Sequence, residues 1–222
     1  MNNTEQTIIR EPDWSQIDTF LTVIHGKLEG LINIRALPSK EQIFSDNSAD
    51  IKNFIAAHIE ENIYCGVASR KDHDGSKAGC FQISCLWVDI DFKDFPGGLD
   101  GAMALRRNFP LMPSIWILSG HGLHLYWLLR EPIAASLEIE PYLKGIGNEL
   151  SADPAATEIA RLMRVPGTFN HKYKDAVVLV ELVELNDNRY ELSDFERWKI
   201  DAQHQRSNRN VKFTESIVDV DI

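Results

Sequence analysis

Long apolar runs are missing from this sequence. Apolar-rich stretches such as residues 115–118 and 177–182 fall far short of the roughly 20 residues that a membrane-spanning helix needs. The first residues, MNNTEQ, offer neither a basic start nor an apolar stretch, so they are not typical of a secretion signal. We therefore expect no association with membranes and a cytoplasmic location.

Cysteine is scarce. The chain has 3 cysteines, Cys65, Cys80 and Cys85, and this odd, scattered set excludes a fully paired disulfide framework and fits a reducing compartment. A zinc site that combines them with His73 is the alternative. Cys65 and Cys85 lie inside apolar, strand-like runs, where a small buried thiol is the more common role. We therefore expect no zinc.

Positive charge is in deficit, with 23 Lys and Arg residues against 33 Asp and Glu residues and a net charge of −10. Duplex binding depends largely on neutralising phosphates, so this balance argues against a nonspecific nucleic-acid coat. It still allows a metal-dependent active site, which brings its own cations and needs only a local basic groove. The sequence also lacks the Gly-x-x-x-x-Gly-Lys-Ser/Thr loop of a P-loop helicase or ATPase.

What the sequence does contain is the apolar content of one globular domain, with 44% hydrophobic residues in 222. Apolar periodicity predicts helices at 14–24, 49–62, 99–109, 134–150 and from Ser193, and strands at 32–36, 63–68, 81–92, 114–118 and 123–129. The last two strands are joined by so short a turn that they must be antiparallel, which predicts an α+β fold. The expected domain spans 14–200, between an N-terminal tail (1–13) and a polar C-terminal tail or linker (201–222).

Two aspartates interrupt the apolar strand at 81–92. Residues two apart on a strand point to the same face, so Asp89 and Asp91 project together while Val88 and Ile90 enter the core. Adjacent carboxylates repel each other and attract a cation, and their hard oxygen atoms suit magnesium or manganese. Two such ions can activate a hydroxyl and stabilise a departing pyrophosphate. A solvated edge strand is the alternative, which the poor strand propensity of aspartate disfavours.

A glycine-rich turn, SGHG at 119–122, joins the strands at 114–118 and 123–129. Glycine lets backbone amides approach an anion, and Ser119 and His124 can donate hydrogen bonds to phosphate oxygens. His121 alone could be an incidental residue of a hairpin turn, but the group as a whole is a candidate phosphate site.

Residues 153–172 form the third group. Asp153 precedes a proline, which is typical of a helix N-cap, and this structural role alone could explain it. Arg161 and Arg164 are expected on one face of the helix that follows, and Lys172 comes after a Pro-Gly break. Such a cluster of cations beside a metal site is what a triphosphate requires.

A polar, glycine-punctuated loop at 69–79 is expected to be mobile and carries Arg70. A solvated surface loop is the common interpretation. Because the loop leads into the strand of the acidic pair, Arg70 is a further candidate for a phosphate contact.

In this order, the three groups resemble the motifs of the archaeo-eukaryotic primase superfamily, in the primase-polymerase branch of phages, plasmids and CRISPR-associated proteins. The acidic pair matches the first motif, the turn that ends at His124 matches the second, and Asp153 is the candidate for the third acidic residue. The run 161–172 is similar to the Arg-x-x-Arg-x-Pro-Gly-Thr-x-Asn-x-Lys signature of phage-type members. The resemblance covers about residues 14–200.

This resemblance implies an RRM-like antiparallel sheet with helices, an N-terminal α/β lobe, and an active site in the cleft between them. It implies that Asp89, Asp91 and Asp153 hold two Mg²⁺ or Mn²⁺ ions. The residues implied to contact the nucleotide are Ser119, His121, His124, Arg161, Arg164, Asn170 and Lys172. The implied reaction is primer synthesis or strand extension from NTPs or dNTPs on a single-stranded template. A fused or separate helicase, or another replication or CRISPR protein, is a candidate partner.

Two alternatives use the same features differently. An RRM-like module could bind single strands without catalysis, with Trp87, Tyr126 and Trp127 stacking on bases. It would have no use for the acidic pair, and such aromatics more often pack in a core. A metal-dependent nuclease is the other alternative, because the same ions can direct water at a phosphodiester.

Overall fold

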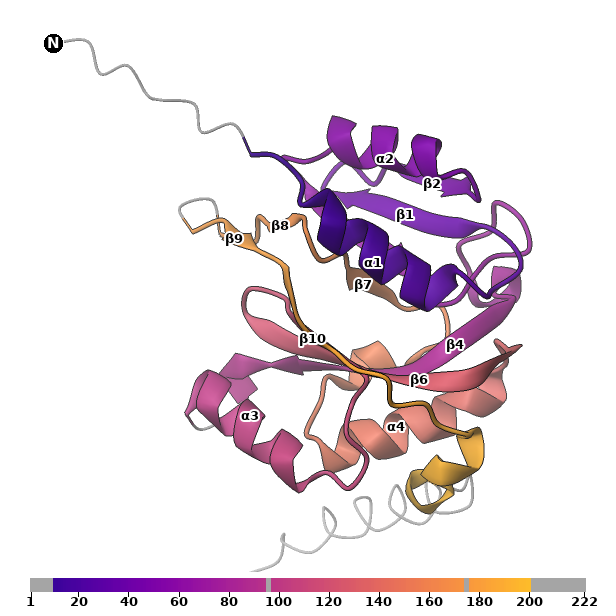
Figure 1. The fold of residues 1–222 in the computed structure, drawn as a ribbon, viewed down its shortest axis with the longest axis vertical. Helices are drawn as coiled ribbons and strands as arrows, with labels where there is room; N and C mark the ends of the chain where they lie inside the picture. The colour runs from indigo at the N-terminus through magenta and orange to yellow at the C-terminus, as the bar shows by residue number, and fades with distance from the viewer. Residues whose placement is uncertain (1–9, 95–96, 174–175, 201–222) are drawn as a thin grey trace, which may run out of the picture.

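The computed structural model describes residues 10–94, 97–173 and 176–200 (Figure 1). The helices are α1 (Trp14–His25), α2 (Ser48–Ala57), α3 (Gly98–Asn108) and α4 (Glu140–Glu149), with short 3₁₀ helices η1 (Lys77–Gly79), η2 (Phe92–Asp94), η3 (Leu137–Ile139), η4 (Pro154–Thr157) and η5 (Leu192–Trp198). The strands are β1 (Ile32–Leu37), β2 (Gln42–Ser45), β3 (Asn62–Gly66), β4 (Gln82–Asp91), β5 (Ile115–Leu118), β6 (Gly122–Ala134), β7 (Leu162–Arg164), β8 (Phe169–Asn170), β9 (Val178–Leu179) and β10 (Glu181–Leu185).

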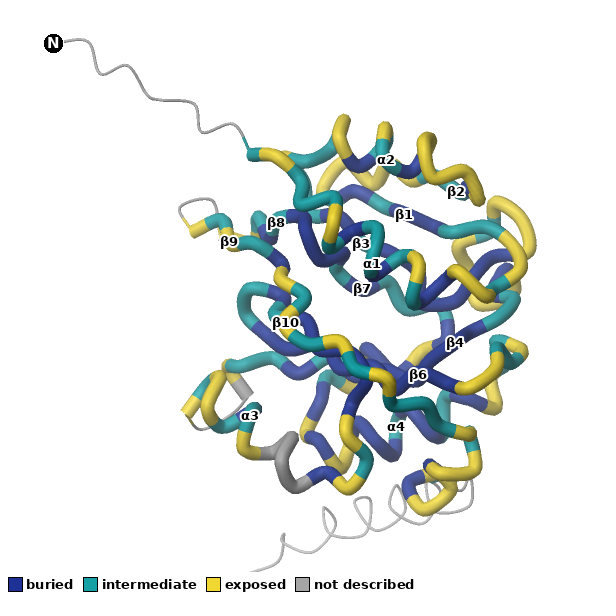
Figure 2. Tube along the Cα trace, viewed as in Figure 1, coloured by how far each residue is buried: buried dark blue, intermediate teal, exposed yellow. Residues whose placement is uncertain are grey.

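Two antiparallel sheets organise the chain, which confirms the predicted α+β class. The first has the order β2-β1-β3-β7 and the second the order β10-β5-β6-β4, while β8 and β9 form a small separate pair. Helix α2 contacts β2, α4 contacts β4, and α1, which lies beside the first sheet in Figure 1, also contacts β4 and β10 of the second. Buried residues are concentrated in the strands of both sheets (Figure 2). Within the described residues, no helix has the length and apolar character needed to cross a membrane.

Local sequence signals explain the elements that place the site. Helix α1 begins where the Asp13 carboxylate accepts hydrogen bonds from the backbone N–H groups of Ser15 and Gln16, and its apolar positions Ile17 and Phe20 are buried. Strand β4 is buried along most of its 10 residues and pairs with β6, as the pattern at 81–92 predicts.

Several boundaries differ from the prediction because pairing between distant segments overrides the local pattern. Strand β2 is not evident from the sequence and forms by pairing with β1. The helix predicted at 134–150 begins later, because β6 continues to Ala134 and η3 follows it. The final helix is 3₁₀, and its capping box uses Glu191 and Asp194 rather than Ser193. The predicted tails lie outside the described residues at 1–9 and 201–222.

The prediction that Arg161 and Arg164 lie on one helix is wrong. Residues 162–164 form strand β7, in which Arg164 pairs with Tyr64 at the edge of β3. Because side chains three apart on an extended chain point to opposite faces, the two arginines diverge instead of sharing a face.

The predicted phosphate contact of Arg70 is also wrong. Its side chain is 0% exposed, and its guanidinium donates hydrogen bonds to the carbonyls of Ser76 (3.1 Å) and Ala160 (3.2 Å) and to the Cys80 sulfur. Its backbone N–H and C=O groups also bond to those of Leu31. Arg70 therefore fastens the 69–79 loop to the core, and the loop's polar composition did not reveal this burial.

The stability of the fold should fall as the pH is lowered from about 6.5 to about 4. Burial, reinforced by the charge of Arg70, lowers the pKa of His25 from 6.5 to about 4. Between these values the unfolded chain binds more protons than the native protein, so acid favours unfolding by up to about 3 kcal/mol from this residue. Urea unfolding at pH 7 and pH 5 should show a weaker pH dependence for His25→Asn than for the wild type.

The matched control for this experiment is His73→Asn, since His73 is exposed. That variant should keep the pH dependence of the wild type. Equal pH dependence in the wild type and the His25 variant would show that His25 titrates normally in the folded protein.

Candidate active site

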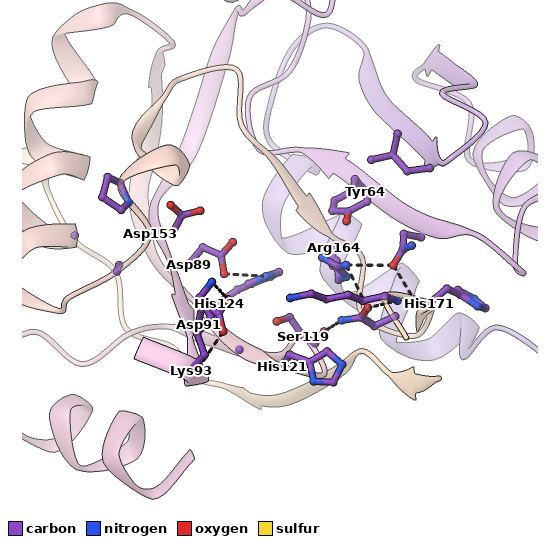
Figure 3. A pocket seen from close by; sticks show the side chains of 18 of the residues that line it. Tyr64, Asp89, Asp91, Lys93, Ser119, His121, His124, Asp153, Arg164 and His171 are labelled. Carbon is purple, nitrogen blue, oxygen red and sulfur yellow. Dashed lines mark hydrogen bonds and ion pairs between the residues drawn. The ribbon is translucent and has the colours of Figure 1, made fainter. Parts of the chain in front are cut away.

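A cleft of about 1040 Å³ contains most of the residues singled out from the sequence (Figure 3). It is lined by residues of both sheets, among them Tyr64 and Arg164 from the first and Asp89 and His124 from the second. The predicted site residues that line it are Asp89, Asp91, Ser119, His121, His124, Asp153, Arg164, Asn170 and Lys172. Arg70 and Arg161 do not line it.

The acidic pair lies at the end of β4, where the strand reaches the cleft. Asp89 is opposite His124 and Asp91 is opposite Gly122 in the β4–β6 pairing. The Asp89 and Asp91 side chains are 23% and 26% exposed, which is enough for access by a solute and too little for full hydration. Partial burial acts to raise the pKa of Asp91, but hydrogen bonds and charge from Lys93 outweigh it and hold that pKa below its usual value.

Asp153 lies beside this pair although it comes 64 positions after Asp89 in the sequence. Its carboxylate accepts a hydrogen bond from the backbone N–H of Ala155 at the start of η4, so the predicted N-cap is confirmed. Its own backbone N–H donates to the Asp89 carbonyl (2.7 Å), and the Trp87 indole donates to the Ala156 carbonyl (2.9 Å). These bonds fix η4 against β4.

His124 is buried, with its Nε2 atom 3.6 Å from Asp89 Oδ1. Burial lowers its pKa to about 4, with Arg164 and Arg161 acting in the same direction and Asp89 opposing them. The imidazole is therefore neutral at pH 7 and has one N–H donor. Its Nδ1 atom has no hydrogen-bond partner within the described residues.

Asn170 connects the glycine-rich turn to the cations. Its side-chain amide donates to the Ser119 carbonyl (2.6 Å), and its Oδ1 atom accepts from Arg164 Nη2 (3.2 Å) and from the Lys172 backbone N–H (3.0 Å). These groups are already engaged within the protein. The geometry therefore favours a role for Asn170 in positioning Arg164 and the turn.

Sequence reasoning missed Asn62, Tyr64 and Lys93. Asn62 Oδ1 accepts hydrogen bonds from Arg164 Nη2 (3.2 Å) and from the His171 backbone N–H (3.0 Å), while the Tyr64 ring lies 4.9 Å from the Arg164 guanidinium carbon. Lys93 Nζ lies 2.8 Å from Asp91 Oδ2. Asn62 belongs to no motif, and Tyr64 begins the stretch 64–68 that resembles the N-terminal half of the family but was given no role in the site. The place of both residues beside Arg164 becomes evident only from the pairing of β3 with β7.

The donor set at this end of the cleft fits magnesium or manganese, which prefer carboxylate oxygens. Within the described part of the chain, no three acidic, histidine or cysteine side chains converge closely enough to hold an ion in this conformation. Arg161 Nη2 instead lies 3.1 Å from Asp89 Oδ2 and 3.6 Å from Asp153 Oδ2. The guanidinium of Arg161 thus already contacts two of the three carboxylates, Asp89 and Asp153, that a metal ion would use.

The chain has the archaeo-eukaryotic primase fold, which the resemblance of its motifs implied. The primase-polymerase domain of cyanophage S-2L superposes with a TM-score of 0.66 at 16% identity, covering 86% of this chain and 100% of that domain. The primase RepB′ superposes with a TM-score of 0.54 at 16% identity, and the match covers 92% of this chain and 68% of that protein. The catalytic domain of RepB′ in complex with initiator DNA superposes with a TM-score of 0.54 at 14% identity, and the match covers 94% of this chain and 100% of that domain.

The sequence comparisons are weaker. No family model matches the chain. The curated Replication protein of Clostridium perfringens is 24% identical over 176 residues, which cover 74% of this chain and 43% of that protein. The chain therefore spans less than half the length of this relative.

Proposed function

We propose that this chain is the catalytic domain of a replication primase-polymerase and transfers nucleotides to a growing strand on a single-stranded template. The observation that carries the proposal is that three carboxylates, Asp89, Asp91 and Asp153, line one cleft of a primase fold together with the cations Arg164 and Lys172. A triphosphate needs both halves: oxygen ligands for its metal ions and cations for its phosphates.

Asp89, Asp91 and Asp153 would hold two Mg²⁺ or Mn²⁺ ions, which, when bound, lower the pKa of an attacking 3′-hydroxyl and neutralise charge on the departing pyrophosphate. The chain's own side chains then have distinct tasks. Neutral His124 donates one hydrogen bond to a phosphate oxygen, while Arg164, oriented by Asn62 and Asn170, binds the phosphates through its guanidinium. Ser119, His121 and Lys172 line the same space and complete the proposed contacts.

The alternative of a single-strand binding module required exposed aromatic side chains that stack on bases. Trp87 is 1% exposed, and Tyr126 and Trp127 are 0% exposed, so none of them can stack on a base. A single-stranded template, a primer strand and NTPs or dNTPs remain the proposed ligands. A helicase or another replication or CRISPR protein remains the proposed partner.

The test is incubation of the protein with a single-stranded template and labelled nucleotides, with and without a primer, in Mg²⁺ or Mn²⁺. We expect incorporation into a product longer than the primer, or into a new primer. Cleavage of the template without incorporation would favour the nuclease alternative. The proposal fails if the folded protein binds DNA but incorporates neither ribonucleotides nor deoxyribonucleotides.

Asn62→Ala should raise the KM for the incoming nucleotide about tenfold with a smaller change in kcat, because Arg164 loses an oriented hydrogen bond to its charged group. Steady-state primer extension over a range of nucleotide concentrations measures this. Asn62→Asp keeps the Oδ1 acceptor and should restore most of the affinity. A KM unchanged in the alanine variant would contradict the positioning role.

A further inference from the structure

Arg161 was predicted to join Arg164 and Lys172 in binding phosphates, but its guanidinium contacts carboxylates instead. Its Nη2 atom lies between Asp89 (3.1 Å) and Asp153 (3.6 Å), and its Nη1 atom donates to the Ala155 carbonyl (3.3 Å). Its side chain is 23% exposed, so both ion pairs are partly shielded from water. Arg161 thus contacts two carboxylates of the nucleotide cleft without itself lining that cleft.

The two carboxylates cannot easily move apart when they are left without a cation. The backbone hydrogen bond from Asp153 to Asp89 and the Asp153 N-cap fix their main chains. Like charges held together in this way destabilise the site unless a positive group neutralises them. Arg161 supplies that charge, and a divalent ion that binds the same oxygens must compete with it.

Arg161 also lines a second groove, of about 770 Å³, whose lining includes residues of all four strands of the first sheet. Arg35 and Tyr64 line this groove as well, and Tyr64 also lines the nucleotide cleft, so the two spaces adjoin. The Nε atom of Arg35 is buried and has no hydrogen-bond partner within the described residues, so the contact with a ligand in the groove falls to the end of its guanidinium. The charged residues that line it are Arg35, Lys77, Arg161 and Glu158, three cations against one acid, and such a groove suits an anionic strand that passes an aromatic ring.

We propose that Arg161 is an internal counter-cation of the metal site, displaced from Asp89 and Asp153 when a divalent ion binds and then directed to a backbone phosphate of a single strand in the Arg35 groove. The identity of the ion and of the strand rests on the proposed function. By linkage, the ion and the strand then strengthen each other's binding through one side chain.

The first test is Mn²⁺ binding, measured from the electron paramagnetic resonance signal of free Mn²⁺. Arg161→Gln should bind Mn²⁺ about three- to tenfold more tightly than the wild type, the range that partly exposed ion pairs support. Arg161→Lys keeps the charge and should stay within about twofold. Arg35→Gln, which removes one charge from the same groove without touching a carboxylate, should also stay within about twofold. If the glutamine variant does not fold, Arg161→Met, which keeps the aliphatic stem, replaces it.

The second test is the fluorescence anisotropy of a labelled single-stranded oligonucleotide with and without Mn²⁺. The wild type should bind more tightly with Mn²⁺, Arg161→Gln should lose this gain, and Arg35→Gln should bind more weakly under both conditions. Unchanged or weaker Mn²⁺ binding by the folded Arg161→Gln or Arg161→Met variant would overturn the proposal, as would a gain with Mn²⁺ that survives in it. Neither measurement needs turnover, so a protein that passes both but incorporates no nucleotide would refute only the proposed reaction.

Discussion

Replacing Asp89 and Asp91 together with asparagine should lower nucleotide incorporation roughly a thousandfold or more. The change keeps the size of both side chains but removes the charge that holds the ions, and bound metal contributes several kcal/mol of transition-state stabilisation. Single-turnover primer extension with Mg²⁺ or Mn²⁺ measures the loss, and circular dichroism checks that the fold is intact.

Asp18→Asn is the matched control for this pair. Asp18 lies on α1, where it pairs with Lys52 (2.7 Å) and does not line the cleft. Its substitution should leave incorporation within about twofold of the wild type, since exposed ion pairs contribute little. A folded double variant that still extends primers at a comparable rate would remove the carboxylate pair from the mechanism.

Gly145→Ala should lower the free energy of unfolding by about 3 kcal/mol or more. A Cβ atom at this position of α4 would lie 1.5 Å from the Trp198 carbonyl oxygen, which is a backbone atom and cannot rotate away. The helix and η5 would have to separate, exposing the apolar contacts between them. Chemical denaturation of the variant, compared with the wild type, measures the change.

Gly147→Ala offers a control two residues away on the same helix. Its Cβ atom would meet Thr157 Cγ2 at 3.6 Å and Ala152 Cβ at 3.9 Å, which are ordinary contacts. Alanine is the better helix former, so this variant should be neutral or more stable by up to about 1 kcal/mol. Equal destabilisation of the two variants would mean that α4 and η5 do not pack as described.

The parts of the fold that the sequence predicted well are those set by neighbours along the chain. The spacing of Ile17, Phe20 and Ile24 defines α1, and the alternation around Asp89 and Asp91 defines the face that the pair occupies. Both signals are local periodicities and need no knowledge of the partner segment.

The parts that failed depend on contacts between distant segments. The run around Arg164 has helical spacing of its charges, but the free edge of β3 makes it a strand. Arg70 belongs to a polar loop, yet its side chain is buried and donates hydrogen bonds to the carbonyls of Ser76 and Ala160. Asn62 has no signature at all, because its role comes from the packing of β3 beside Arg164 and His171. Propensity cannot supply such tertiary information.

The register of β4 against β6 decides whether the carboxylates of Asp89 and Asp91 reach the cleft. Asp89 faces the cleft beside His124 because the two are directly opposite, and a slip by one residue would turn both aspartates into the core. The register is irregular between Ile83 and Cys85, on the side away from the cleft. An insertion or deletion there can be absorbed by the bulge, whereas one between Cys85 and Asp91 would dismantle the carboxylate pair without changing a single functional residue.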